Sequence, residues 1–511
     1  MVKLNSRFAF LILLVTGIAI VIGCWDIGHP GLYYDEMLFG NAAVGGKTNE
    51  FVQWRVHGIP VLLMDYIGAL KAWIYYPIFS VFPVNAWSVR LPSLLIGILG
   101  GLALVLSLWR GFGPAAAVAG AVLILLDPTL ITHSRLDWGP NALMFFFRGW
   151  MVFCTVEWIR TGKPLWAWLA WIILCLGLFD KLNFIWVACA GIGALVVVYP
   201  AALRTFARTY PRQAAGLAVL ILAVLGMTIF RCISVAEHKD IGWGPRIAFA
   251  WGQLRVVFTG GGALKFISGD GLRLEKWLLP VYGLAAVVSL TGWKTLGRIP
   301  SARRLYAWIW VFFLLLVAAF ILTKSAEGPH HAAVVSGIWQ LVLAPLLGAS
   351  WEARTRMVRG LLVPAALALV AAGCVVANGI CIRAFAEPLN LNWDRANARA
   401  ALFGRAHPGV WFLSVDWGIG AQFETLTRGN PDIHDAWSSF ERRENAVTWI
   451  RDSVRTGENY VYTRLPGFEN FKGNRDNFLA ALDSNHLRYI PLMRYPDWKG
   501  EDMIEIGKIE K

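Results

Sequence analysis

The chain has 511 residues, of which 57% are hydrophobic and only 16% are charged, and its mean hydropathy is +0.53. Soluble proteins carry charges at about a quarter of their positions, so a water-soluble globular fold is excluded. The 26 Trp and 29 Phe residues exclude a disordered or collagen-like chain. The composition leaves a polytopic membrane protein.

The net charge of +14 suggests a nucleic-acid partner until it is located along the chain. Residues 1–382 hold 30 Lys and Arg against 15 Asp and Glu, whereas residues 383–511 hold 17 against 18. The positive excess therefore lies among the apolar segments, where basic loops mark the cytoplasmic side of a membrane protein. We expect no nucleic-acid partner. None of the seven cysteines follows Cys381, so no disulfide framework is expected in the outer region.

In chain order the sequence offers eleven stretches that are long and apolar enough to span a bilayer. The first follows basic residues, yet it lacks a small-residue cleavage site, so we expect an anchor rather than a removed signal peptide. Placing basic loops inside puts the N-terminus in the cytoplasm and the residues after the last span outside. The predicted spans are 8–25, 88–109, 115–131, 141–159, 165–180, 182–200, 214–233, 277–292, 305–323, 332–350 and 360–381.

Two long outer loops and a polar C-terminal region complete the predicted architecture. Loop 26–87 contains an apolar but charge-interrupted segment, 59–82, that favours a helix lying at the membrane interface. Loop 234–276 is basic and Gly-rich, and either closes over a site or connects two helices. After residue 382, short apolar runs alternate with helix-like stretches, which indicates an α/β domain. We predict a transmembrane domain over 1–382 and an extracytoplasmic α/β domain over 383–511.

The acidic pair Asp35 and Glu36 follows Tyr33 and Tyr34 just outside the first span. Carboxylates near lipid are costly to desolvate unless they are paired or used, which makes both candidates for catalysis. A solvated turn leading into a helix N-terminus is the structural alternative, because acids suit that end of a helix.

A third acid, Asp137, lies in the short second outer loop, within His133–Asn141. It faces the same predicted side as Asp35, so the two carboxylates are expected to converge around a sugar hydroxyl or a divalent metal ion. Local pairing between Asp137 and Arg135 is the alternative.

Four cationic or imidazole side chains are predicted to contact the phosphate of a lipid. Lys71 and Arg90 are expected at headgroup depth, where snorkelling is the alternative role. His330 and His331 lie at the outer mouth of a span; as a two-histidine metal site the pattern is weak, because adjacent side chains diverge. Arg148, inside a predicted span, needs a partner or a water-filled cavity.

The residues resemble the GT-C superfamily of membrane glycosyltransferases, and within it the protein O-mannosyltransferase and aminoarabinose (lipid A) transferase group. The likeness rests on the Tyr-Asp-Glu motif after the first span, on the segments GALKAWIYYPIFSVF and VRLPSLL, and on the second-loop Asp. It implies an inverting transfer from a polyprenyl-phosphate sugar, with Asp35 as the base, Glu36 completing the motif and Asp137 as the second-loop acid. It also implies a phosphate-binding role for Lys71 and relates His330 and His331 to a GPHH pattern. The chain lacks the Lys-Pro-Pro of aminoarabinose transferases, which weighs against lipid A as the acceptor.

The predicted protein is therefore a plasma-membrane enzyme that transfers a hexose or pentose from a lipid-phosphate donor to an envelope lipid, glycan or protein hydroxyl. A base and phosphate-binding cations suffice for that reaction, since the donor is already activated. A divalent metal ion held by Asp35 and Asp137 is the candidate cofactor. The alternative functions are a transporter or flippase of lipid-linked sugars, for which Arg148 is the main argument, and a non-catalytic partner in an envelope assembly.

Overall fold

The computed structural model describes residues 6–44, 52–235, 242–323, 328–352, 357–430, 432–454 and 459–511. Packing divides the chain into two units. The first comprises Met1–Trp25, Asp65–Gly68 and Arg90–Arg383, and the second Asp26–Met64, Ala69–Val89 and Ala384–Lys511. The division after Arg383 lies next to the predicted one at 382, while most of the first long loop groups with the C-terminal region rather than with the spans.

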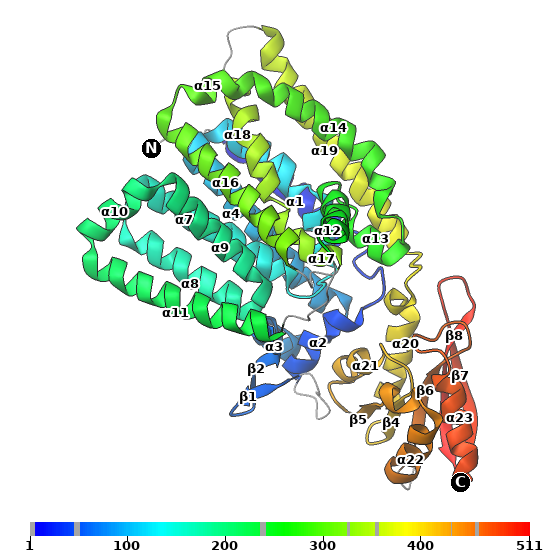
Figure 1. Ribbon diagram of the computed structural model, residues 1–511. Coiled ribbons are helices and arrows are strands. Elements are labelled where there is room, and N and C mark those ends of the chain that lie inside the picture. The colour runs from blue at the N-terminus through cyan, green and yellow to red at the C-terminus, as the bar shows by residue number, and fades with distance from the viewer. Residues whose placement is uncertain are drawn as a thin grey trace. The chain divides into compact units, whose positions relative to one another are not determined.

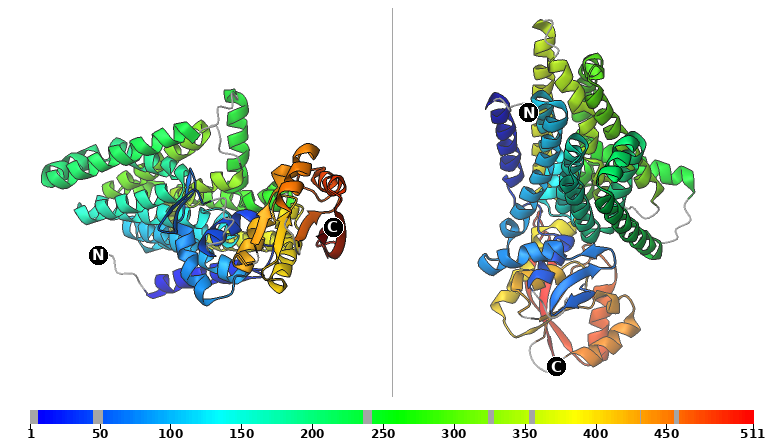
Figure 2. Two further views of the ribbon diagram at one scale, coloured as in Figure 1. Left: turned by 90° about the horizontal axis from the view of Figure 1, so that it is seen from below. Right: turned by 90° about the vertical axis from the view of Figure 1, so that its left-hand side faces the viewer.

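The first unit is a helical bundle in which long helices run side by side (Figures 1 and 2). It also holds the short strand β3 (Ile67–Gly68). Its helices are α1 (Ser6–Cys24), α4 (Ala86–Phe112, which begins in the second unit), α5 (Pro114–Gly120), η1 (Ala121–Leu125), α6 (Pro128–Arg135), α7 (Asn141–Thr161), α8 (Pro164–Asp180), η2 (Leu182–Phe184), α9 (Ile185–Val198), α10 (Pro200–Thr209), α11 (Pro211–Val235), α12 (Trp243–Phe258), α13 (Gly262–Ser268), η3 (Gly271–Leu274), α14 (Glu275–Ser289), η4 (Leu290–Gly292), α15 (Trp293–Gly297), α16 (Pro300–Leu322), α17 (Pro329–Ala332), η5 (Ala333–Val335), α18 (Ile338–Glu352) and α19 (Met357–Phe385).

The predicted multi-span fold is confirmed, since every predicted span falls on helical structure. Within the described residues, eight helices are long and apolar enough to cross a membrane. Two bent pairs raise this number to ten: Pro114–Leu125 with Pro128–Arg135, bent by 52°, and Leu182–Val198 with Pro200–Thr209, bent by 91°. The apolar 17-residue helix α8 coincides with the remaining predicted span.

Arg148 has partners inside the bundle. Its Nη1 donates to the carbonyl of Val334, and its guanidinium lies 5.1 Å from the ring centre of Phe145. Asp127, also buried in the bundle, lies near this guanidinium. Asp127 in turn accepts hydrogen bonds from Ser336 Oγ at 2.6 Å and from Gln340 Nε2 at 2.9 Å. Arg148 is thus part of a polar network that links α7 to the segment around α18.

The second unit begins with α2 (Tyr34–Val44), strands β1 (Trp54–Val56) and β2 (Ile59–Met64), and α3 (Leu70–Val81). The prediction of one interfacial helix over 59–82 was wrong in its first part, because only 70–81 is helical. His57 and Gly58 both have positive φ, 49° and 83°, as a tight hairpin turn requires. That turn pairs β1 with β2 in an antiparallel hairpin.

The C-terminal region is the expected α/β domain. Its sheet has the order β5-β4-β6-β8-β7, in which β5, β4 and β6 are parallel and β8 is antiparallel to both of its neighbours. The elements are η6 (Leu391–Trp393), α20 (Arg395–Phe403), η7 (Gly404–Ala406), β4 (Trp411–Ser414), α21 (Gly420–Thr427), β5 (Asp432–Asp435), η8 (Trp437–Phe440), α22 (Arg443–Ser453), β6 (Asn459–Arg464), α23 (Asn474–Ser484), β7 (Arg488–Pro496) and β8 (Asp502–Glu510).

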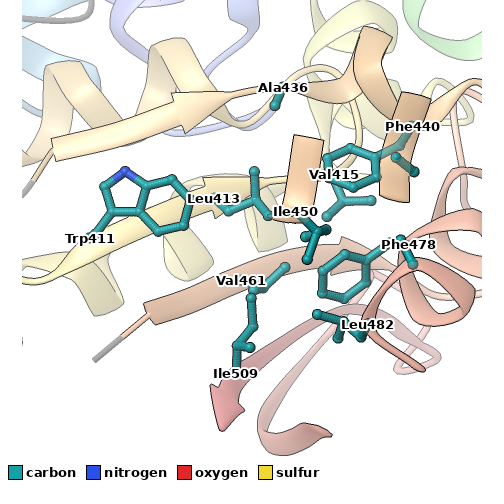
Figure 3. Close-up of a cluster of buried hydrophobic side chains, with 12 residues drawn as sticks. Trp411, Leu413, Val415, Ala436, Phe440, Ile450, Val461, Phe478, Leu482 and Ile509 are labelled. Atoms are coloured by element: carbon teal, nitrogen blue, oxygen red, sulfur yellow. The ribbon is translucent and has the colours of Figure 1, made fainter. Parts of the chain in front are cut away.

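Alternation along β4 gives this domain a core on each face of the sheet. Trp411 and Leu413 face a cluster that includes Ile450 of α22 and Phe478 of α23 (Figure 3). Phe412, between them, stacks instead against aromatic rings from α21 and β6. Helices therefore cover both faces, and the loops after the parallel strands are held in place.

Candidate active site

The acidic motif forms the first turn of α2 in the second unit. Glu36, fully buried, accepts a hydrogen bond from the backbone N–H of Tyr33 at 2.9 Å. This is the contact by which an acid at the third position of a helix caps its N-terminus. Asp35 is only partly buried, and its charge is favoured by the same helix end. The motif thus presents one capping carboxylate and one accessible carboxylate.

Aromatic rings of the C-terminal domain enclose the two tyrosines. Tyr33 stacks on Trp393 with ring centres 4.3 Å apart and planes within 9°, and Tyr34 lies 4.7 Å from Trp417. Burial, reinforced by the charges of Asp35 and Glu36, holds the pKa of the Tyr33 hydroxyl well above its ordinary value. Tyr33 therefore stays neutral beside the acids.

Trp417 is itself held in position by Asp416. The Asp416 carboxylate accepts the backbone N–H groups of Trp417 at 2.8 Å and Asn470 at 2.8 Å. Burial raises the pKa of Asp416, and the nearby Arg464 guanidinium, at 3.7 Å, opposes that rise. A buried ion pair and hydrogen bonds to backbone N–H groups thus hold Trp417 against the acidic motif.

Helix α2 packs along α21 of the C-terminal domain. Asn41 donates to Glu424 at 2.8 Å, and Thr425 Oγ1 donates to the carbonyl of Met37 at 3.1 Å. A Cβ added at Gly40 would lie 2.7 Å from the Thr425 methyl group. Glycine is therefore required at this crossing, and the acidic motif is anchored to the α/β domain.

Lys71, in the first turn of α3, lies against the same helix. Its Nζ is 4.2 Å from the ring centre of Phe39, and the side chain is almost fully buried. Phe39 follows Asp35 by four residues and so shares its side of α2. The predicted base and the predicted phosphate-binding lysine therefore lie along one side of one helix.

In the first unit, the other predicted acid follows α6 in an unusual backbone conformation. Asp137 has a φ of 52° and is fully buried. Asp and Asn tolerate this left-handed region better than other side chains. Arg135, the alternative local partner, donates Nη1 to the carbonyl of Trp25 at 2.8 Å.

Trp138, next to Asp137, is the centre of an aromatic and imidazole cluster. Its ring stacks on His133 at 5.7 Å and contacts Phe266 at 4.3 Å and His330 at 4.7 Å. His331 follows with its ring centre 4.1 Å from that of His330. The predicted histidines are thus brought to the loop that carries Asp137. Glu327, which precedes them in the sequence motif, lies outside the described residues.

The Gly-rich stretch of the long loop builds the floor of this cluster. A Cβ at Gly262 would lie 2.9 Å from the His133 ring, and one at Gly260 would lie 2.6 Å from Pro128. Small residues therefore allow α13 to approach α6 and bring Phe266 against Trp138. This stretch packs on the site, which favours the first of its two predicted roles.

Two polar groups near the cluster were not predicted as site residues. The Nζ of Lys181 would lie 3.9 Å from a Cβ at Gly139, and Asn183 Nδ2 approaches His331 Nδ1 at 3.5 Å. Arg90, predicted to bind phosphate, is fully buried in the second turn of α4. Among the described residues no group of three or more His, Cys, Asp and Glu forms a metal-binding cluster.

The predicted site residues therefore gather in two groups, one in each unit. Asp35, Glu36 and Lys71 lie on α2 and α3, and His330 and His331 lie beside the Asp137 loop. His133, Trp393 and Trp417 lie beside these groups and were not among the site residues predicted from the sequence. His133 was visible in the same short loop as Asp137, whereas the two tryptophans lie more than 350 residues from the motif and gave no local signal.

Comparisons with known proteins agree with this architecture. Residues 69–228 match the model of the dolichyl-phosphate-mannose-protein mannosyltransferase family. ArnT from Cupriavidus metallidurans, solved in the apo state, has a similar fold, with a TM-score of 0.63 and 14% identity over 98% of each chain. The same protein bound to undecaprenyl phosphate gives a TM-score of 0.60 with the same identity and coverage.

The predicted resemblance to GT-C glycosyltransferases is confirmed. An oligosaccharyltransferase from Archaeoglobus fulgidus, tethered to an acceptor peptide, also has a similar fold, with a TM-score of 0.54 and 12% identity over 98% of this chain and 74% of the other. At such identities the solved structures show a shared fold. A comparison with curated protein sequences gives no match.

Proposed function

We propose that this protein transfers a sugar from a polyprenyl-phosphate donor to a hydroxyl of an envelope lipid, glycan or protein. The observation that carries the proposal is the match to lipid-phosphate mannosyltransferases over residues 69–228, which include Lys71, Arg90 and Asp137. The ArnT-like fold of the whole chain supports it.

Asp35 acts as the general base. Its accessible carboxylate at the α2 N-terminus accepts the proton of the acceptor hydroxyl as the hydroxyl oxygen bonds to the anomeric carbon. The bond from that carbon to the phosphate oxygen breaks, and the polyprenyl phosphate leaves with the electron pair. A single displacement of this kind inverts the anomeric centre, and a phosphate leaving group needs no general acid.

The cations hold the departing phosphate. Lys71, on the Asp35 side of α2, is a point charge suited to it, and Arg90 is a second candidate cation. His330 and His331 are candidate hydrogen-bond donors to the phosphate. Asp137 accepts hydroxyl hydrogen bonds from the sugar; binding a divalent metal ion is its alternative use. Glu36 positions the base, since its contact is a helix cap.

Basic loops fix the expected orientation. The N-terminus lies in the cytoplasm of a plasma membrane, and the α/β domain and the reaction lie on the opposite side. Arg148 was the main argument for the transporter alternative, and the partners of that side chain inside the bundle weigh against it.

The test is release of polyprenyl phosphate from undecaprenyl- and dolichyl-phosphate hexoses and pentoses by the purified protein in liposomes supplied with an envelope extract as the source of acceptor hydroxyls. We expect Asp35→Asn to lower turnover by about 1,000-fold, within the range of general-base catalysis, while thermal stability is kept. Asp65→Asn, the same change at an exposed site of the first outer loop, is the matched control and should retain full turnover. Full turnover by Asp35→Asn would remove the base assignment, and sugar-lipid movement without release would favour a flippase.

A further inference from the structure

The second unit contains a cavity of 440 Å³ beside the acidic motif. Its wall includes the start of α20, the turn after β7 and the segment just before the motif. Four charged side chains line it: Arg395, Arg399, Asp394 and Asp497. Its volume is within the range of small-molecule sites in proteins.

The charges of this wall are balanced, and that balance selects the ligand. Two guanidinium groups and two carboxylates line the cavity. A simple anion would be repelled by the carboxylates, and a simple cation by the guanidinium groups. A neutral molecule that carries both donors and acceptors matches such a wall. Sugar hydroxyls have this property, because each one donates one hydrogen bond and accepts others.

The carboxylates are also held by the backbone. Asp394 accepts the N–H groups of Ala396 at 2.7 Å and Trp498 at 2.9 Å. Asp497 Oδ1 accepts those of Lys499 at 2.8 Å and Glu501 at 3.0 Å. These contacts fix the loops that form the wall, so the cavity is preorganised.

One arginine is oriented by a histidine of the opposite wall. Arg395 Nη1 donates to His29 Nε2 at 3.1 Å, so the His29 proton is on Nδ1 and is donated to Asp26 at 2.8 Å. Arg399, four residues along α20, is on the same side of that helix. The two guanidinium groups therefore project from one face of α20.

An indole ring completes the wall. Trp498 is 37% exposed, and its Nε1 donates to the carbonyl of Pro388 at 2.9 Å, which holds the ring in one orientation. A flat, anchored aromatic face suits the apolar C–H face of a pyranose ring, which buries apolar area while its hydroxyls reach the polar wall.

The cavity is joined to the catalytic motif by Trp393. Trp393 lines the cavity, its carbonyl accepts the N–H of Gly31 at 2.6 Å, and its ring stacks on Tyr33. Tyr33 precedes Asp35 by two residues. A ligand in the cavity is thus bound next to the segment that carries the base.

We propose that this cavity binds a neutral saccharide unit of the acceptor, and that Arg395, Arg399 and Trp498 contact it. The inference rests on the proposed function, because it makes the acceptor of that reaction a glycan or glycolipid. The bound saccharide places the acceptor hydroxyl for Asp35 without taking part in the bond changes.

The experiment is saturation-transfer NMR on the full-length protein in detergent, without donor. The probes are neutral hexoses and disaccharides, with inorganic phosphate as the competitor. We expect saccharide binding with a Kd of about 1 mM, typical of a small site of this kind, and binding at least about 10-fold weaker for Arg399→Leu and Trp498→Ala. Arg488→Leu, the same change at an exposed arginine of β7 outside the cavity, should bind as the unaltered protein does.

The outcomes separate this inference from the reaction itself. Asp35→Asn should bind saccharide normally, since the base is not a cavity residue. Absence of saccharide binding, displacement by phosphate, or unaltered binding by both cavity variants would each overturn the inference, even if donor turnover is observed. Saccharide binding by a protein that never releases polyprenyl phosphate would uphold the cavity and overturn the proposed reaction.

Discussion

The two groups of predicted site residues are built in different ways. The acidic motif of the second unit is a helix N-terminus, in which Glu36 caps the turn and Asp35 stays accessible, all within four residues. The cluster of the first unit is assembled from the loop after α6, from α13 and from α17, whose members Trp138, Phe266 and His330 are far apart in sequence. Local sequence therefore sets the chemistry of the acidic motif, and packing sets that of the Trp138 cluster.

This difference has a consequence for mutation. A substitution in the acidic motif that removes a charge but keeps an acceptor at position 36 is expected to change the fold little, because the side chain there still accepts the Tyr33 N–H that caps the turn. A substitution in the Trp138 cluster is expected to change stability as well, because each ring supports the others. Four changes test this comparison, and they follow in order of decreasing expected effect.

Among these four changes, the largest effect on turnover is expected for Asp137→Asn. Asn tolerates the positive φ of this position, so the change removes the charge while it keeps the backbone. We expect turnover to fall by about 100-fold or more, measured as release of polyprenyl phosphate. Asp137→Gly, which also accepts positive φ, should show the same loss. Turnover equal to that of the unaltered protein in both variants would assign Asp137 to local structure alone.

Trp138→Ala is expected to lower the free energy of unfolding by about 3–5 kcal/mol, the usual cost of removing a buried large aromatic side chain. Thermal unfolding in detergent measures it. Trp87→Ala, at an exposed tryptophan in the first turn of α4, is the matched control and should change stability by less than about 1 kcal/mol. A small effect at Trp138 would show that the cluster is not held together by that ring.

Lys71→Met keeps the packing against Phe39 and removes the charge. If Lys71 holds the donor phosphate, the KM for the lipid donor should rise by about 10-fold, the lower range for a hydrogen bond to a charged group. Lys71→Arg should recover part of the loss, and Lys472→Met, at an exposed lysine of the second unit, should have no effect. An unchanged KM would assign Lys71 to packing.

The smallest effect is expected for Glu36→Gln, because the amide oxygen still accepts the Tyr33 N–H. The free energy of unfolding should change by less than about 1 kcal/mol, and turnover should stay within a few-fold of the unaltered value. Glu36→Leu removes the acceptor and should cost about 1 kcal/mol. A loss of turnover by Glu36→Gln as large as that of Asp35→Asn would make Glu36 a catalytic acid, as the motif alone predicted.

The sequence predicted the arrangement of spans because twenty-residue apolar stretches admit few other structures in a bilayer. It predicted the α/β domain because strand and helix patterns alternate clearly after residue 383. It failed at 59–64, where the apolar residues suggested a continuing helix and the positive φ values of His57 and Gly58 produced a hairpin. Turn geometry at two residues there overrode composition.

The sequence by itself determined the membrane class, the spans and the candidate acids, since these follow from apolar length and from the scarcity of charge. Only the tertiary structure separated the capping role of Glu36 from the accessible carboxylate of Asp35. It alone set Trp393 beside Tyr33, and His330 beside Trp138. These contacts join residues separated by hundreds of positions, and they depend on how helices and loops pack, which no local pattern records.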